Sequence, residues 1–168
     1  IGTMKIQYCL LLFLLLLGFT QCKSPAAKED RLSDDALMDT VQRRTFNYFW
    51  EGAEPNSGLA RERIHMDGVY PENDQNVITS GGSGFGIMAI LAGIDRGYVT
   101  RQEGLERMEK IVSFLETADR FHGAYPHWWY GDTGKVKPFG QKDNGGDLVE
   151  TAFIMPVSYT HLRAHETL

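Results

Sequence analysis

The sequence predicts a mainly helical domain, all-α in class, that is built from helical hairpins and carries one small β-hairpin. Apolar residues recur at helical spacing in several segments, whereas the pattern of residues 123–137 is that of a hairpin. Polar, glycine-containing stretches separate the helical segments, and this favours helical hairpins over alternating β and α units. The 168 residues, 42% of them hydrophobic, suffice for one domain with a modest core.

The first expected helix begins after Ser33, whose hydroxyl can cap it, and ends before Gly52. Its apolar stripe includes Leu37, Val41 and Tyr48. A polar loop over residues 56–79 is expected to follow.

A second helix is predicted from the glycine-rich run at 80–86 to Arg96–Gly97. One of its faces is apolar and is made of Ile87, Ile90, Leu91 and Ile94. Another face carries small residues, which allow close contact with a neighbouring helix: Gly82, Gly86, Ala89 and Gly93.

A third helix is predicted after Thr100, which forms a capping-box pattern with Glu103. Beyond it, the expected hairpin at 123–137 turns at residues 131–134. A last helix is expected to begin near 144–146 and to be apolar on most of its surface, as interior helices are.

The beginning of the chain has the pattern of an export signal. Lys5 precedes an apolar run at 8–19 that is too short to span a membrane, so residues 1–21 are predicted to be a signal peptide with extra upstream residues. Cys22 follows this run and resembles the lipidated cysteine of a bacterial lipobox; an ordinary cleaved signal is the alternative. Residues 22–32 are then expected to form a tether.

The end of the chain has the pattern of non-native sequence. Residues 157–167 resemble the translation of a common transposase sequencing adapter, so 157–168 are predicted to be a non-native tail. The expected domain therefore covers residues 33–156.

Composition and spacing exclude several functions. A net charge of −5 and a pI of about 5.5 leave no basic footprint, so no nucleic-acid partner is expected. Gly84, Gly86 and Ala89 match a dinucleotide fingerprint formally, but no βαβ unit surrounds them and close packing explains them better. No metal site is expected, because the body histidines lack ligand spacing: His65, His122 and His127.

Three acids form the first candidate site. Asp143, Asp147 and Glu150 lie at i, i+4 and i+7, which places them on one face if the last helix includes Asp143. Complementation of the helix dipole, with Asp143 as the N-cap, is the alternative explanation. A catalytic pair of carboxyl groups normally comes from two elements, so this cluster supplies either one catalytic acid or acids that only bind substrate.

Four aromatic residues precede these acids and form the second candidate site. Sugar C–H faces stack on aromatic rings, so a carbohydrate site is predicted at Tyr125, Trp128, Trp129 and Tyr130. A small hydrophobic core beneath a loop is the alternative use of these rings.

Four stretches together resemble the glucoamylase-like domain family, whose relatives include bacterial endo-β-1,2-glucanases. These stretches are 44–50, 79–86, 96–104 and 143–153. The resemblance implies an (α/α)6 toroid, of which only the first helical hairpins are present, in an inverting glycoside hydrolase that needs no cofactor. It also implies that Asp143, Asp147 and Glu150 line a cleft for a glucan, most simply a β-1,2-glucan, and that the general acid lies beyond residue 155.

The same resemblance and the leader predict an exported protein, periplasmic or anchored as a lipoprotein in the outer membrane of a Gram-negative bacterium. A lipid on Cys22 is then the only expected membrane contact. The alternative function is a non-catalytic surface lipoprotein that binds glycans.

Overall fold

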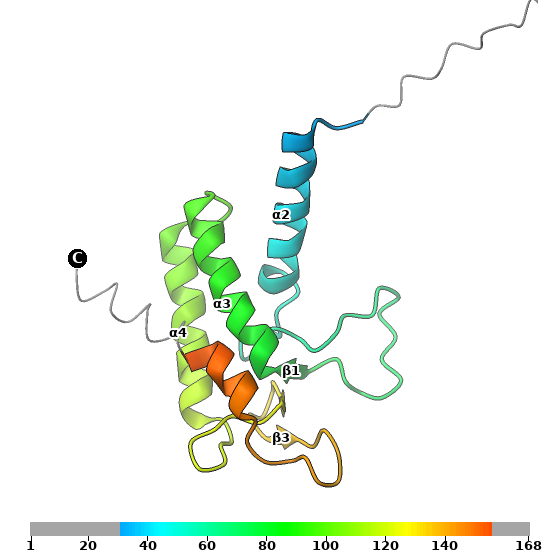
Figure 1. Cartoon of the computed structure of the whole chain (residues 1–168), viewed down its shortest axis with the longest axis vertical. Helices are drawn as coiled ribbons and strands as arrows, with labels where there is room; N and C mark the ends of the chain where they lie inside the picture. The colour runs from blue at the N-terminus through cyan, green and yellow to red at the C-terminus, as the bar shows by residue number, and fades with distance from the viewer. Residues whose placement is uncertain (1–30, 156–168) are drawn as a thin grey trace, which may run out of the picture. The chain divides into compact units, whose positions relative to one another are not determined.

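The computed structural model describes residues 31–155. The chain divides into two compact units after Ala36, and the second unit carries all the elements except the first turn of α2. The helices are α2 (Asp34–Trp50), α3 (Ser80–Asp95) and α4 (Arg101–Thr117), with one more at 148–155 (Figure 1). The strands are β1 (Val77–Thr79), β2 (Trp128–Tyr130) and β3 (Val136–Lys137). The predicted helical class with a small hairpin is confirmed.

The predicted starts of the first and third helices, α2 and α4, are confirmed in atomic detail. The Ser33 hydroxyl accepts a hydrogen bond from the Ala36 amide at 3.3 Å and caps α2. At the start of α4, Thr100 accepts from the Glu103 amide at 3.2 Å, while the Glu103 carboxylate accepts from the Thr100 amide at 2.7 Å. This reciprocal pair satisfies amide groups that the first turn of a helix leaves free.

Glycines on α3 make room for aromatic side chains of α2. A Cβ atom at Gly93 would lie 2.2 Å from Cε2 of Phe46, and one at Gly86 would lie 3.1 Å from the Phe49 ring. The side chain of Phe46 is buried in this contact. Any larger residue at position 93 therefore has to displace the ring.

The sheet has three strands in the order β1-β2-β3, and both pairs are antiparallel. The predicted hairpin is confirmed as β2 and β3, whereas β1 lies in a segment expected to be loop. Three residues are too few to display a period of two in the sequence. Because all the strands within residues 31–155 are antiparallel, the described part of the chain holds no parallel βαβ unit for a dinucleotide.

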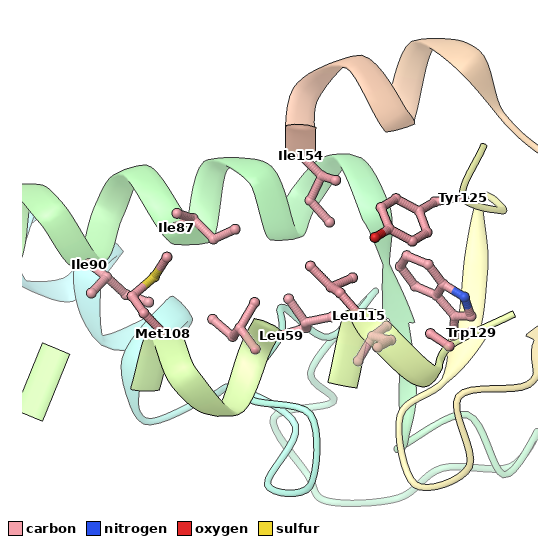
Figure 2. Packing of buried hydrophobic residues seen from close by; sticks show 11 residues of the cluster. Leu59, Ile87, Ile90, Met108, Leu115, Tyr125, Trp129 and Ile154 are labelled. Atoms are coloured by element: carbon pink, nitrogen blue, oxygen red, sulfur yellow. The ribbon is translucent and has the colours of Figure 1, made fainter. Parts of the chain in front are cut away.

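One hydrophobic cluster joins α3, α4, the sheet and the helix at 148–155. Tyr125 and Trp129 lie together at one end of this cluster, with Ile90 and Met108 at the other (Figure 2). Ile154 is fully buried and attaches the last helix to the cluster.

The last helix differs from its prediction in two respects. It begins at 148 instead of near 144–146, because glycines at 145 and 146 favour a loop and Asp147 provides the N-cap. It is not interior in the described residues, since Leu148, Val149 and Phe153 are exposed. None of the helices that the structure describes is both long and apolar enough to cross a bilayer.

Candidate functional site

Three segments that are distant in sequence meet at the candidate site: the start of α3, residues 125–127 and the start of the helix at 148–155. Ser80 donates its amide hydrogen to the carbonyl of His127 at 3.2 Å and its hydroxyl to the carbonyl of Pro126 at 2.8 Å. The amide of Asp147 donates to the carbonyl of Tyr125 at 2.7 Å. These bonds position the acids beside the hairpin that carries the aromatic residues.

Glu150 points at the N-terminus of α3. Its Oε2 accepts from the amide of Gly81 and from the hydroxyl of Thr79 at 3.3 Å. The hydroxyl oxygen of Ser80 lies 3.4 Å from the same Oε2, while its hydrogen is directed to Pro126. Thr79 is the N-cap residue of α3, but within the described residues its side chain accepts no hydrogen bond from the amides of the first turn. Glu150 supplies the missing acceptor, and its negative charge complements the positive end of the helix dipole.

Asp147 uses both of its carboxylate oxygens within the protein. Oδ1 accepts from the amides of Val149 and Glu150, each at 2.9 Å, and thereby caps the last helix. Oδ2 lies 3.0 Å from Nδ1 of His127. The Glu150 amide lowers the pKa of the Asp147 carboxyl most strongly; partial burial opposes this, and His127 lowers the pKa further, so the net shift is downward.

Asp143 lies apart from this arrangement, in the loop before the last helix. Its backbone carbonyl accepts from the amides of Phe139 and Gly140, and its side chain is exposed. Since the helix starts at 148, the condition that put all three acids on one helical face is not met. The structure brings Asp147 and Glu150 to the same site and leaves Asp143 on a neighbouring turn.

The four predicted aromatic residues divide between two environments. Trp129 is 0% exposed and donates its indole N–H to the carbonyl of Asp119 at 3.1 Å. Tyr125 is 6% exposed and contacts Trp129 with ring centroids 5.2 Å apart. Burial raises the pKa of the Tyr125 hydroxyl, an effect that Arg120 partly offsets. Both rings belong to the core of the described residues.

Trp128 and Tyr130 lie on the opposite face of the strand, because side chains alternate along β2. Trp128 is half-buried and Tyr130 is exposed. Thr79, Trp128 and Lys137 occupy the same register across the three strands, and Nζ of Lys137 lies 4.6 Å from the Trp128 ring centroid. This row ends at Thr79, which donates to Glu150, so polar and aromatic groups share one surface.

Two residues of this surface were not predicted from the sequence. Phe139 lies 4.7 Å from Trp128 and 4.5 Å from His127 between ring centroids, and it is exposed. The spacing of His127 in the sequence excludes it as a metal ligand and indicates no other role. The one signal that could have identified them is the hairpin, which places the residues flanking its two strands next to each other.

A shallow hollow of about 170 Å³ borders this region. Its lining is made of Asp119, Arg120, Phe121, Pro126, Val136, Asn144 and Gly145. Within residues 31–155, no three His, Cys, Asp or Glu side chains gather as metal ligands do.

The chain is similar to several proteins of known structure. A provisionally named glucoamylase of Bacteroides caccae is 89% identical, and its crystal structure matches with a TM-score of 0.72 over 74% of this chain and 30% of its own. An endo-β-1,2-glucanase from Chitinophaga pinensis, solved with sophorotriose and glucose, is 70% identical, with a TM-score of 0.74 over 76% of this chain and 30% of its own. The chain is a homologue of glucoamylase-like proteins and β-1,2-glucanases.

A curated relative points the same way. The exo-β-1,2-glucooligosaccharide sophorohydrolase of Parabacteroides distasonis is 58% identical over 124 residues, which are 73% of this chain and 16% of that protein. The chain thus spans less than a third of the length of these relatives. No family model matches it. The predicted resemblance is confirmed, while Cys22 and the tail at 157–168 lie outside the described residues.

Proposed function

We propose that the protein to which these residues belong is a glycoside hydrolase that cleaves β-1,2-linked glucan by inversion. The observation that carries this is the surface formed by Trp128, Lys137 and Tyr130 beside Glu150, in a chain 70% identical to an endo-β-1,2-glucanase. Aromatic rings offer faces for sugar C–H groups, and carboxylates accept hydrogen bonds from hydroxyl groups.

Inverting hydrolysis needs two carboxyl groups on opposite sides of the scissile bond. One donates a proton to the leaving oxygen, and the other activates the water that attacks the anomeric carbon. Asp147 and Glu150 come from one helical turn and therefore approach a ligand from one side. In the proposed site they and Asp143 supply at most one member of the catalytic pair, and the other acids bind or orient the sugar. At least one member of the pair comes from outside residues 31–155.

The alternative is a glycan-binding protein without catalysis, and one observation favours it. Asp147 uses both oxygens, and Glu150 uses Oε2, to accept hydrogen bonds from protein groups. Carboxylates held in this way suit a rigid binding surface better than proton transfer.

The first experiment is to sequence the source DNA across the codon for Met155. A reading frame that continues into further helices and acids supports the hydrolase, and a frame that ends at residue 168 overturns it. The protein encoded by that frame is called the intact gene product below.

Glu150→Gln in the intact gene product separates the two functions. For a hydrolase that uses Glu150, turnover of β-1,2-glucan falls while oligosaccharide binding remains. Glu109→Gln, on the exposed side of α4, is the matched control and leaves both unchanged. If wild-type protein binds the glucan but releases no product, the binding function is correct and the hydrolase proposal is wrong.

Export and lipidation are also proposed, on the leader at residues 1–21 and the position of Cys22. Metabolic labelling with palmitate should mark the intact gene product, and Cys22→Ser should abolish the label. Fractionation of Gram-negative cells should then place the wild type with the outer membrane and the variant with the soluble periplasm. Unlabelled wild-type protein in the periplasm would leave an ordinary cleaved signal as the explanation.

A further inference from the structure

His127, Trp128 and Phe139 form a cluster of three rings, here called the ring cluster. The centroid distances are 4.5 Å between His127 and Phe139, 4.7 Å between Trp128 and Phe139, and 5.5 Å between His127 and Trp128. Phe139 is 52% exposed, so the ring cluster faces solvent instead of forming part of the core. Trp128 lies on β2, His127 directly precedes that strand, and Phe139 follows β3, so the hairpin sets the spacing of the three rings.

Asp147 determines which nitrogen of His127 is available. The Asp147 Oδ1 is occupied by two backbone amides, and its Oδ2 lies 3.0 Å from Nδ1 of His127. An ionised carboxylate can only accept, so Nδ1 must be the donor. The neutral imidazole therefore presents Nε2 as an acceptor, and no hydrogen-bond partner of Nε2 is found within residues 31–155.

We propose that the ring cluster is a binding subsite for one glucose unit of the substrate, and that His127 accepts a hydrogen bond from a sugar hydroxyl through Nε2. Trp128 and Phe139 contact the C–H face of the pyranose, and Asp147 is the positioning residue that sets the tautomer of His127. This inference rests on the proposed function, since it names a part of that site. Asp147 can orient His127 without contacting the sugar, which suits a carboxylate whose two oxygens already have partners within the protein.

Two substitutions of His127 separate its two nitrogens. His127→Asn keeps a donor near the position of Nδ1 and removes Nε2, whereas His127→Gln places an amide near Nε2 and withdraws the donor from Asp147. If His127 only supports Asp147, Asn is tolerated and Gln is not. If Nε2 binds the sugar, Asn weakens binding although the thermal unfolding midpoint stays close to that of the wild type.

The measurement is calorimetric binding of a β-1,2-linked glucotriose to the intact gene product, together with kcat and KM. Loss of one neutral hydrogen bond is expected to raise Kd and KM about five- to tenfold in His127→Asn, with a smaller change in kcat. Phe139→Leu should raise Kd several-fold, and its exposed position keeps it informative even if the histidine variant does not fold. Unchanged Kd in a folded His127→Asn variant, or in Phe139→Leu, overturns the inference.

A second readout follows the tautomer directly. In ¹⁵N-histidine-labelled protein, His127 should carry its proton on Nδ1, and Asp147→Asn should move the proton to Nε2 while the helix cap persists, because Asn caps as well as Asp. A wild-type signal from the Nε2–H form overturns the inference.

The matched control uses another exposed pair of rings, Phe121 and His122, whose centroids are also 4.5 Å apart. Phe121→Leu and His122→Asn are expected to leave binding unchanged. Equal losses from this pair would mean that exposed rings act nonspecifically, which contradicts the subsite. Wild-type protein that neither binds nor cleaves the glucan overturns the proposed function itself, and this result differs from an active wild type with unaffected variants.

Discussion

Glu150 caps α3 from 69 residues further along the chain, by accepting a hydrogen bond from the amide of Gly81. This contact joins the start of one helix to the first turn of another and leaves no room for a side chain at position 81. A Cβ atom there would lie 2.2 Å from Oε2 of Glu150, and the three nearest atoms all belong to that residue. The glycine at position 81 and the Glu150 carboxylate therefore depend on each other structurally.

Gly81→Ala should therefore have different consequences in two backgrounds. In the wild type, the methyl group displaces the Glu150 carboxylate, and the lost cap of about 1 kcal/mol offsets the higher helix propensity of alanine. In a Glu150→Ala background the clash is gone, and the same change should raise the free energy of unfolding by up to about 1 kcal/mol. Denaturant unfolding of the four proteins measures the coupling. Identical effects in both backgrounds would show that the two residues act independently.

The sequence allowed the acids to be identified but not the groups that they contact. The alternative explanation of the acids made Asp143 the N-cap, whereas Asp147 is the residue that caps the last helix. The second cap could not be predicted, because Glu150 acts on a helix that begins about 70 residues earlier. Helix starts with a local signature, such as Thr100 with Glu103, were predicted correctly for the opposite reason.

The carboxyl group of Glu54 is expected to make the stability of the protein depend on pH in the acid range. It is 0% exposed, and its carboxylate accepts from the amides of Asn56 and Ser57 and from both of their side chains. Burial opposes ionisation, but these bonds together outweigh it and hold the pKa of Glu54 below its usual 4.5. As the pH falls, the unfolded chain takes up this proton first, so stability present above pH 4.5 declines below it.

Glu54→Gln should lower the free energy of unfolding by about 1–3 kcal/mol at pH 7, because an amide NH₂ then faces hydrogen-bond donors. The difference from wild type should shrink as the pH falls below 4.5 and through the lower pKa of the folded state, because Glu54 then becomes uncharged as well. Urea unfolding of the intact gene product between pH 3 and 7 measures both effects. Glu109→Gln, exposed on α4, serves as the control; a pH-independent difference at Glu54 would contradict the prediction.

Gly93→Ala tests the packing of α2 on α3. The new methyl group would lie 2.2 Å from a ring carbon of Phe46, which is buried. We expect a loss of about 1–3 kcal/mol from overpacking. Phe46→Leu should recover part of that loss, so the double variant is more stable than the sum of the single changes indicates. Gly140→Ala, with nothing within 4 Å of the added Cβ, should be neutral, and simple additivity would show that the ring is not the obstacle.

The sequence predicts the helices better than the site. Helical periodicity can be recognised within one segment, whereas the two faces of a strand are distinguished only once its partner strand is known. The sequence pattern predicts the hairpin at the correct residues, but it does not separate the aromatic residues by face. Cross-strand register then buries Trp129 beside Ile78 and leaves Trp128 beside Thr79 and Lys137. The face of each ring depends on this pairing, since a shift of one residue would exchange them.

Removal of Trp129 should therefore affect mainly stability, and removal of Trp128 mainly oligosaccharide binding. Trp129→Ala loses a fully buried ring and the bond from its indole N–H to Asp119, so the intact gene product should be destabilised by about 3–5 kcal/mol. Trp128→Ala removes a half-buried ring on the outer face, and unfolding should change by about 1 kcal/mol or less while oligosaccharide Kd rises several-fold. Thermal unfolding and calorimetry on both variants distinguish the roles. A large stability loss at Trp128 with unchanged Kd would assign that ring to the core and would leave the glucan without its stacking surface on this strand.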